Sequence, residues 1–133
     1  MRIHPQGANT GESTGALFAD DIDRMTGAPC SLAILAVCGA AGGPQRIGDD
    51  GAAHLGGALL ARGARGVIVS HGELAVGATM QLLTVLLAEL DAGRTPAHAL
   101  LRARQQVAST PERTHPFHFA GIQLVGANVS PWK

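Results

Sequence analysis

A chain of 133 residues has the length of one ordinary domain, and its ten basic residues balance its ten acidic residues. This neutral balance, together with an aromatic content of only 3%, argues against a surface that binds nucleic acid. The sequence has no apolar run long enough for a membrane span and no signal peptide, so we expect a cytosolic protein with no membrane partner. Cys30 and Cys38 cannot form a disulfide framework and lack the spacing of a zinc site, and we expect no metal and no cofactor.

The composition also predicts the fold class and the domain organisation. With 46% hydrophobic and 15% charged residues, the chain is typical of a compact α/β fold with buried strands. Polar, turn-forming residues dominate the start of the chain, which predicts a flexible N-terminal segment over 1–16. We expect one α/β domain over 17–128 and a short C-terminal tail over 129–133.

The first part of the expected domain contains a short helix and an apolar strand. Helical spacing of apolar residues predicts a helix over 16–25, with Ile22 and Met25 on its apolar face. Residues 31–37 are apolar on both faces and are bounded by a proline and a glycine, which predicts a central strand of a parallel sheet. Cys38 follows this strand directly.

The next segments predict a parallel crossover. Apolar residues at three-and-four spacing indicate a helix over 49–61, and Gly63 is placed to end it. A second strand, Gly66–Ser70, follows at once. A strand, a helix and a second strand form a βαβ unit, so we expect this strand to run parallel to the strand before Cys38.

Two further helices and a last strand complete the predicted domain. The first of these helices spans 77–91, and Thr95 with Pro96 begins a second helix that continues to about Val107. A final strand is predicted within 117–126. The apolar stripe expected along the first helix consists of Met80, Leu83, Leu87 and Leu90.

Cys38 is the main candidate for chemistry, because the carboxyl ends of the strands are where α/β sheets place their functional groups. A glycine-rich turn over 39–43 follows it, and the backbone amides of Gly39 and Ala40 are candidate donors to an oxyanion. The competing interpretation is that Cys38 is a small core residue at the end of an apolar strand. The glycines lack the pattern of a phosphate loop or of a dinucleotide-binding fingerprint.

A nucleophilic thiolate needs a base or a cation beside it, which directs attention to the histidines. His71 follows the strand Gly66–Ser70 and is expected at the same sheet edge as Cys38. His4 is the other candidate, because the polar loop after it can return it to that edge. A solvated surface histidine is the competing interpretation for both. The remaining histidines fall within expected helices or flank the last strand: His54, His98, His115 and His118.

Several segments have the order and spacing of a known family. They are 32–39, 48–50, 59–70, 93–100 and 122–126. In this order they resemble the C-terminal portion of the CHAT domain, a member of the caspase-like cysteine peptidase group, and the similarity runs over 17–126. The resemblance implies an α/β fold with a mostly parallel, caspase-like sheet and helices on both faces, here without the N-terminal strands of a complete sheet.

The resemblance also implies roles for particular residues. The family's nucleophile ends a strand at the position matched by Cys38, which makes Cys38 the implied catalytic thiol. The family's second catalytic residue is a histidine in a His-Gly pair at the end of the preceding strand. In this chain His4 is followed by Pro5, whereas His71 and Gly72 reproduce the dipeptide one strand later.

Two functions follow from these observations. One is a cysteine peptidase-like hydrolase that acts on a protein or peptide, with Cys38 as nucleophile and His4 or His71 as base. The other is an inactive or partial CHAT domain that serves as a protein-interaction or regulatory module. Because a sheet without its N-terminal strands leaves an apolar edge uncovered, we expect a homo-oligomer or a partner chain at that edge.

Overall fold

The computed structural model describes residues 19–27, 30–36, 55–70 and 74–130. Within these ranges the chain forms four α-helices, three strands and two short 3₁₀ turns. In chain order they are α1 (Ala19–Arg24), β1 (Leu32–Leu35), α2 (Leu55–Ala61), β2 (Gly66–Ser70), α3 (Val76–Asp91), α4 (Pro96–Ala108), η3 (Pro111–Arg113), η4 (Pro116–His118) and β3 (Ile122–Gly126).

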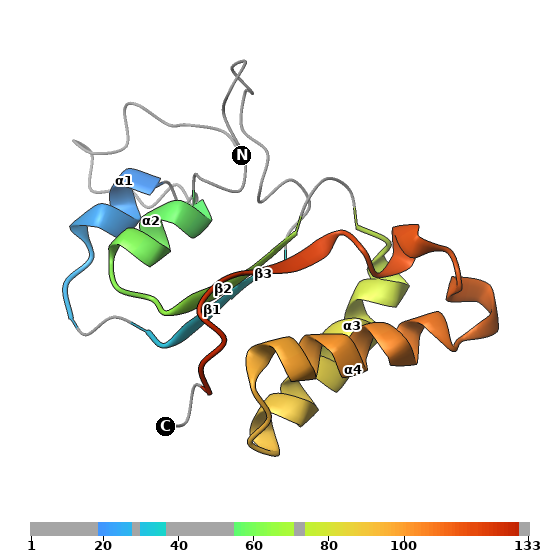
Figure 1. Ribbon diagram of the computed structural model, residues 1–133. Helices are drawn as coiled ribbons and strands as arrows, with labels where there is room; N and C mark the ends of the chain where they lie inside the picture. The colour runs from blue at the N-terminus through green and yellow to red at the C-terminus, as the bar shows by residue number, and fades with distance from the viewer. Residues whose placement is uncertain (1–18, 28–29, 37–54, 71–73, 131–133) are drawn as a thin grey trace.

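The three described strands form one mixed sheet in the order β1-β2-β3 (Figure 1). β1 and β2 pair in parallel, with Leu32 opposite Gly66 and Leu35 opposite Val69. β2 and β3 pair antiparallel. The parallel βαβ crossover predicted from the sequence is therefore confirmed.

Within the described sheet the central strand is β2, whereas the sequence predicted a central position for the strand before Cys38. All five residues of β2 are buried, and all four residues of β1 are half-buried. Both strands are short and apolar, so their sequences do not distinguish the centre of a sheet from its edge. Pairing on both sides buries β2 more completely.

Alternate residues of β2 pack on opposite sides of the sheet. Val67 and Val69 belong to a buried cluster with Ala64, and Leu59 and Leu60 of α2 pack against it. Ile68 belongs to a larger cluster with residues of α3 and α4. α1 and α2 accordingly lie on one side of the sheet, and α3 and α4 lie on the other (Figure 1).

The buried face of α3 differs from the predicted stripe. Met80 and Leu87 of the predicted stripe are 61% and 55% exposed, so these two residues do not belong to the buried face. Ten of the 16 residues of this helix are hydrophobic, and several faces therefore have helical spacing. The face that packs on α4 and the sheet includes small side chains, which allow the helices to approach closely. It consists of Ala78, Thr79, Leu82, Leu86 and Leu90.

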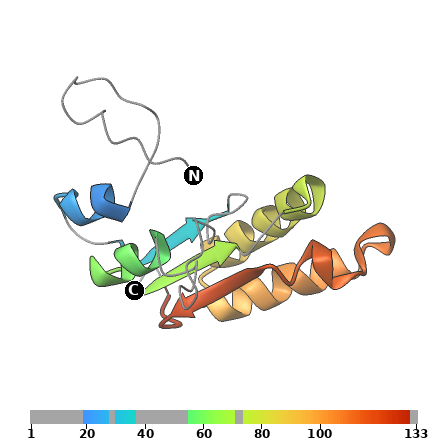
Figure 2. The ribbon, with the colours of Figure 1, turned by 90° about the horizontal axis from the view of Figure 1, so that it is seen from above.

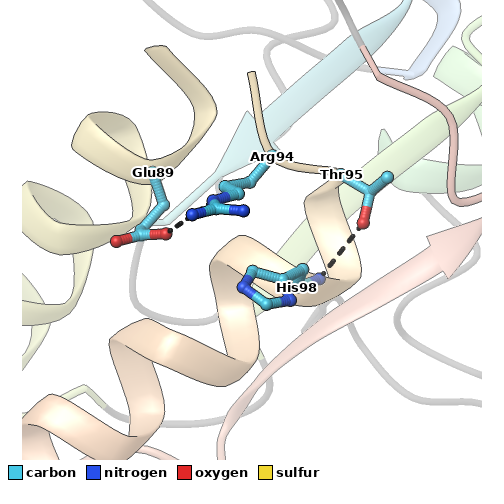
Figure 3. A network of polar contacts seen from close by, with 4 residues as sticks. All are labelled: Glu89, Arg94, Thr95 and His98. Carbon is cyan, nitrogen blue, oxygen red and sulfur yellow. Dashed lines mark hydrogen bonds and ion pairs between the residues drawn. The ribbon is translucent and has the colours of Figure 1, made fainter. Parts of the chain in front are cut away.

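The turn between α3 and α4 is held by short-range polar contacts (Figure 3). Arg94 Nε lies 3.7 Å from Glu89 Oε2, in an ion pair that links the end of α3 to the turn. The His98 backbone N–H donates to Thr95 Oγ1 at 3.5 Å. This contact confirms Thr95 as the N-cap of α4, with Pro96 in the first turn, as the sequence predicted.

Glycine and proline residues set two further boundaries of helices and strands. Gly63 has a φ of 110°, which suits glycine and ends α2 where the sequence predicted. The final strand is shorter than the predicted 117–126, because Pro116 begins the turn η4 and β3 starts only at Ile122. The expected N-terminal segment over 1–16 and the first half of the expected helix over 49–61 lie outside the described residues.

Candidate functional site

The carboxyl ends of β1 and β2 lie side by side. Their parallel register places Leu35, the last residue of β1, opposite Val69. The next residue of β2, Ser70, is fully buried, and its Oγ donates a hydrogen bond of 3.4 Å to the Leu35 carbonyl oxygen. The two strand ends are thus joined by a side-chain contact as well as by the ladder.

The close approach of α2 to β2 supports this part of the sheet. A Cβ atom at Gly56 would lie 3.2 Å from Val69 Cγ1, a contact so tight that Val69 or α2 would have to shift slightly to accept a larger residue. Val69 itself is 1% exposed. The absence of a side chain at Gly56 therefore lets α2 pack closely against Val69, the residue of β2 that precedes Ser70.

The predicted catalytic group follows these strand ends in the sequence. Cys38 comes two residues after Ala36, the last described residue after β1, and His71 comes directly after Ser70. Both residues lie outside the described ranges, as do the second candidate base, His4, and the two predicted oxyanion donors, Gly39 and Ala40. Their roles accordingly stay predictions.

The second cysteine belongs to the opposite end of β1. Cys30 is exposed and lies two residues before the strand, whereas Cys38 follows the strand in the sequence. Seven residues, among them the four of β1, separate the two cysteines along the chain. Among the described residues, no three Cys, His, Asp or Glu side chains are grouped so that they could hold a metal ion.

The structure describes the contacts of three histidines outside the predicted site. His98 lies in the first turn of α4, where its backbone N–H is capped by Thr95. His115 caps η4, since its Nδ1 accepts from the Phe117 backbone N–H at 3.1 Å. His118 packs edge-to-face against Phe117, and its Nδ1 is buried without a hydrogen-bond partner.

Sequence reasoning missed two polar residues that the structure makes prominent. The sequence identifies Ser70 only as the end of a strand, whereas in the structure its Oγ donates to the carbonyl oxygen at the end of the neighbouring strand. Arg104, on α4, is half-buried, and burial lowers the pKa of its guanidinium from the ordinary value. Nothing in the sequence distinguishes Arg104 from Arg102, which lies in the same predicted helix.

A family model of the CHAT domain matches residues 4–127, which is nearly the whole chain. The chain belongs to the CHAT domain family, which is caspase-like. No curated protein and no solved structure matches it. No helix in the described ranges is long and apolar enough to cross a membrane.

Proposed function

We propose that this chain is a cysteine peptidase-like hydrolase of the CHAT family, with Cys38 as its nucleophile and a histidine as its base. The observation that supports this most is the parallel pairing of β1 with β2. Because parallel strands end at the same edge of a sheet, β1 and β2 end at neighbouring points, and in the sequence Cys38 and His71 follow these two strands. The family match, which covers residues 4–127, supports the same chemistry.

In the proposed reaction the Cys38 thiolate attacks the carbonyl carbon of a peptide bond. The backbone amides of Gly39 and Ala40 donate to the oxyanion, and the histidine that took the thiol proton returns it to the leaving amine. Water then hydrolyses the thioester and frees the thiol. A reduced thiol suits a reducing compartment, and we place the reaction in the cytosol.

The base is His71 in the arrangement that we favour. It follows β2 directly, and Ser70 is buried and bonded to the end of β1, so the chain enters position 71 from a fixed point. His4, the first residue of the family match, is the alternative base. We propose that one CHAT domain extends from residue 17 to residue 128. His71 lies within this domain, and His4 lies in the segment that precedes it.

The experiment is the pH dependence of Cys38 alkylation by iodoacetamide in a Cys30→Ala background. A thiol beside an imidazolium has a pKa below the ordinary value of about 8.5, so alkylation should already be fast at pH 6 to 7. Substitution of the true base by alanine should raise the Cys38 pKa back to about 8.5. His98→Ala, which changes a histidine in the first turn of α4, is the matched control and should leave the profile unchanged.

Each histidine variant answers a separate question. Loss of the reactive thiolate in His71→Ala, with His4→Ala unaffected, identifies His71 as the base, and the reverse result identifies His4. An ordinary alkylation profile in the Cys30→Ala protein itself would overturn the hydrolase proposal.

The second candidate function is a protein-interaction or regulatory module without catalysis. It is supported by the position of β1 at the end of the described sheet and by its four half-buried apolar residues, because an edge strand of this kind is a template for pairing. This function predicts an unreactive Cys38 together with an oligomer or a stable complex. Sedimentation velocity on the purified chain, combined with the alkylation profile, separates the two functions.

A further inference from the structure

The outer edge of β3 presents backbone groups in a defined pattern. The Ala127 N–H donates to the Arg65 carbonyl oxygen at 2.7 Å, which makes residues 65 and 127 a hydrogen-bonded pair of the antiparallel ladder. Such pairs alternate with non-hydrogen-bonded pairs. The N–H and C=O groups of Ile122, Leu124 and Gly126 therefore point away from β2.

This edge is open among the described strands. β3 pairs with β2 alone, and it lies at the margin of the sheet beside α4 (Figure 2). Ile122 is buried and Leu124 is half-buried, whereas Gln123, Val125 and Gly126 are exposed. The strand thus has a packed inner face, and on its outer edge the Ile122 carbonyl oxygen is bonded to Arg104 whereas the groups of Leu124 and Gly126 have no partner strand among the described strands.

A pocket of about 460 Å³ opens where this edge meets α4 and the segment before β3. Part of its lining is apolar, and among the described residues its one charged lining residue, Arg104, comes from α4. The lining residues are Arg104, Phe119, Ala120, Gln123 and Leu124. The pocket is open to solvent, so an extended chain along β3 would pass over it.

Arg104 holds a positive charge in this pocket with no carboxylate beside it in the described part of the chain. Its Nη2 donates to the Ile122 carbonyl oxygen, one of the outward backbone groups of β3. Its Nε is buried without a hydrogen-bond partner among the described residues. A guanidinium has five N–H donors in a planar fork that matches a carboxylate, and a half-buried charge of this kind is stabilised by an anionic partner.

We propose that the outer edge of β3 and the Arg104 pocket together bind an extended, acidic peptide segment of a protein partner. The segment would add as a further strand to the sheet, with its backbone paired to the outward groups of Leu124 and Gly126. A glutamate or aspartate on the side facing α4 would pair with the Arg104 guanidinium. Phe119 and Leu124 would contact the apolar part of that side chain.

This binding site is separate from the proposed hydrolase chemistry, because β3 and β1 lie on opposite edges of the described sheet. The backbone pairing gives affinity for any extended chain, whereas Arg104 gives the preference for acidic residues. The site therefore requires no activity at Cys38, and it applies equally to an active enzyme and to an interaction module.

The test uses two mixtures of acetylated, amidated pentapeptides that are randomised at four positions. One mixture has glutamate at the central position and the other has glutamine. Binding to the ¹⁵N-labelled full chain is followed by the amide shifts of Leu124 and Gly126. We expect the glutamate mixture to bind about tenfold more tightly than the glutamine mixture, and to lose most of this preference when the salt concentration is raised.

Matched variants assign the preference to one arginine. Arg104→Gln should remove the difference between the two mixtures, whereas Arg102→Gln, which changes an exposed arginine two residues earlier, should retain it. Peptides that are N-methylated at alternate positions should bind far more weakly, because methylation removes the donors needed for strand addition. Equal affinity of the unmodified mixtures for the wild-type chain, or shifts confined to residues away from β3, would overturn the proposal without the use of any variant.

Discussion

The two sides of the sheet differ in the amount of buried structure that they contribute. On one side α3 and α4 have 16 and 13 residues, and with the sheet they bury a cluster of ten residues. On the other side α1 and α2 have six and seven residues, and two clusters of three buried residues lie there: Ile22, Leu55 and Ala58, and Ala64, Val67 and Val69. Among the described residues the buried core therefore lies mainly on the α3–α4 side, while the candidate chemistry depends on the edge where β1 and β2 end.

The largest stability effect is expected on the α3–α4 side. Leu86 is fully buried, and Leu86→Ala should lower the free energy of unfolding by about 3 kcal/mol through lost burial and a new cavity. The neighbouring Leu87 is 55% exposed, and Leu87→Ala should cost less than about 1 kcal/mol. Urea denaturation followed by circular dichroism measures both changes. Equal losses in the two variants would contradict the assigned buried face of α3.

A smaller effect is expected on the α1–α2 side. Ile22 is 1% exposed but packs in the small cluster, so Ile22→Ala should cost about 2 kcal/mol, at the low end of the range for buried aliphatic residues. Met25, which is 54% exposed, is the matched position, and Met25→Ala should change stability little. If Ile22→Ala destabilises the chain as much as Leu86→Ala does, the two sides contribute equally and the comparison fails.

The sequence was sufficient for elements with strong local signals. Gly66–Ser70 is an apolar run between turn residues, and Thr95 with Pro96 carries a helix start in two residues, so both were predicted correctly. The buried face of α3 was not predictable, because leucines occur on several of its sides and only the contact with α4 selects Leu82 and Leu86. That selection is a property of tertiary packing.

For the candidate site, the sequence predicted the arrangement of the strands but not the side-chain contacts. Strand order along the chain predicted that β1 and β2 end at one edge, because a βαβ unit makes its strands parallel. The contact between Ser70 and the Leu35 carbonyl oxygen joins residues 35 positions apart, and Arg104 in the pocket bonds to a residue 18 positions away. Contacts between such distant residues leave no periodic pattern in the sequence, and the structure was needed to find them.

The most direct test of the account is whether positions 38 and 71 lie within bonding distance. In a Cys30→Ala, His71→Cys variant, mild oxidation with glutathione disulfide should form an intramolecular disulfide from Cys38 to the introduced thiol, since a disulfide requires Cα atoms about 4.4 to 6.8 Å apart. Mass spectrometry of the trypsin-digested protein detects the linked peptides. A folded variant that keeps both thiols free, while a Cys30→Ala, His4→Cys variant forms the link, would contradict the pairing of Cys38 with His71.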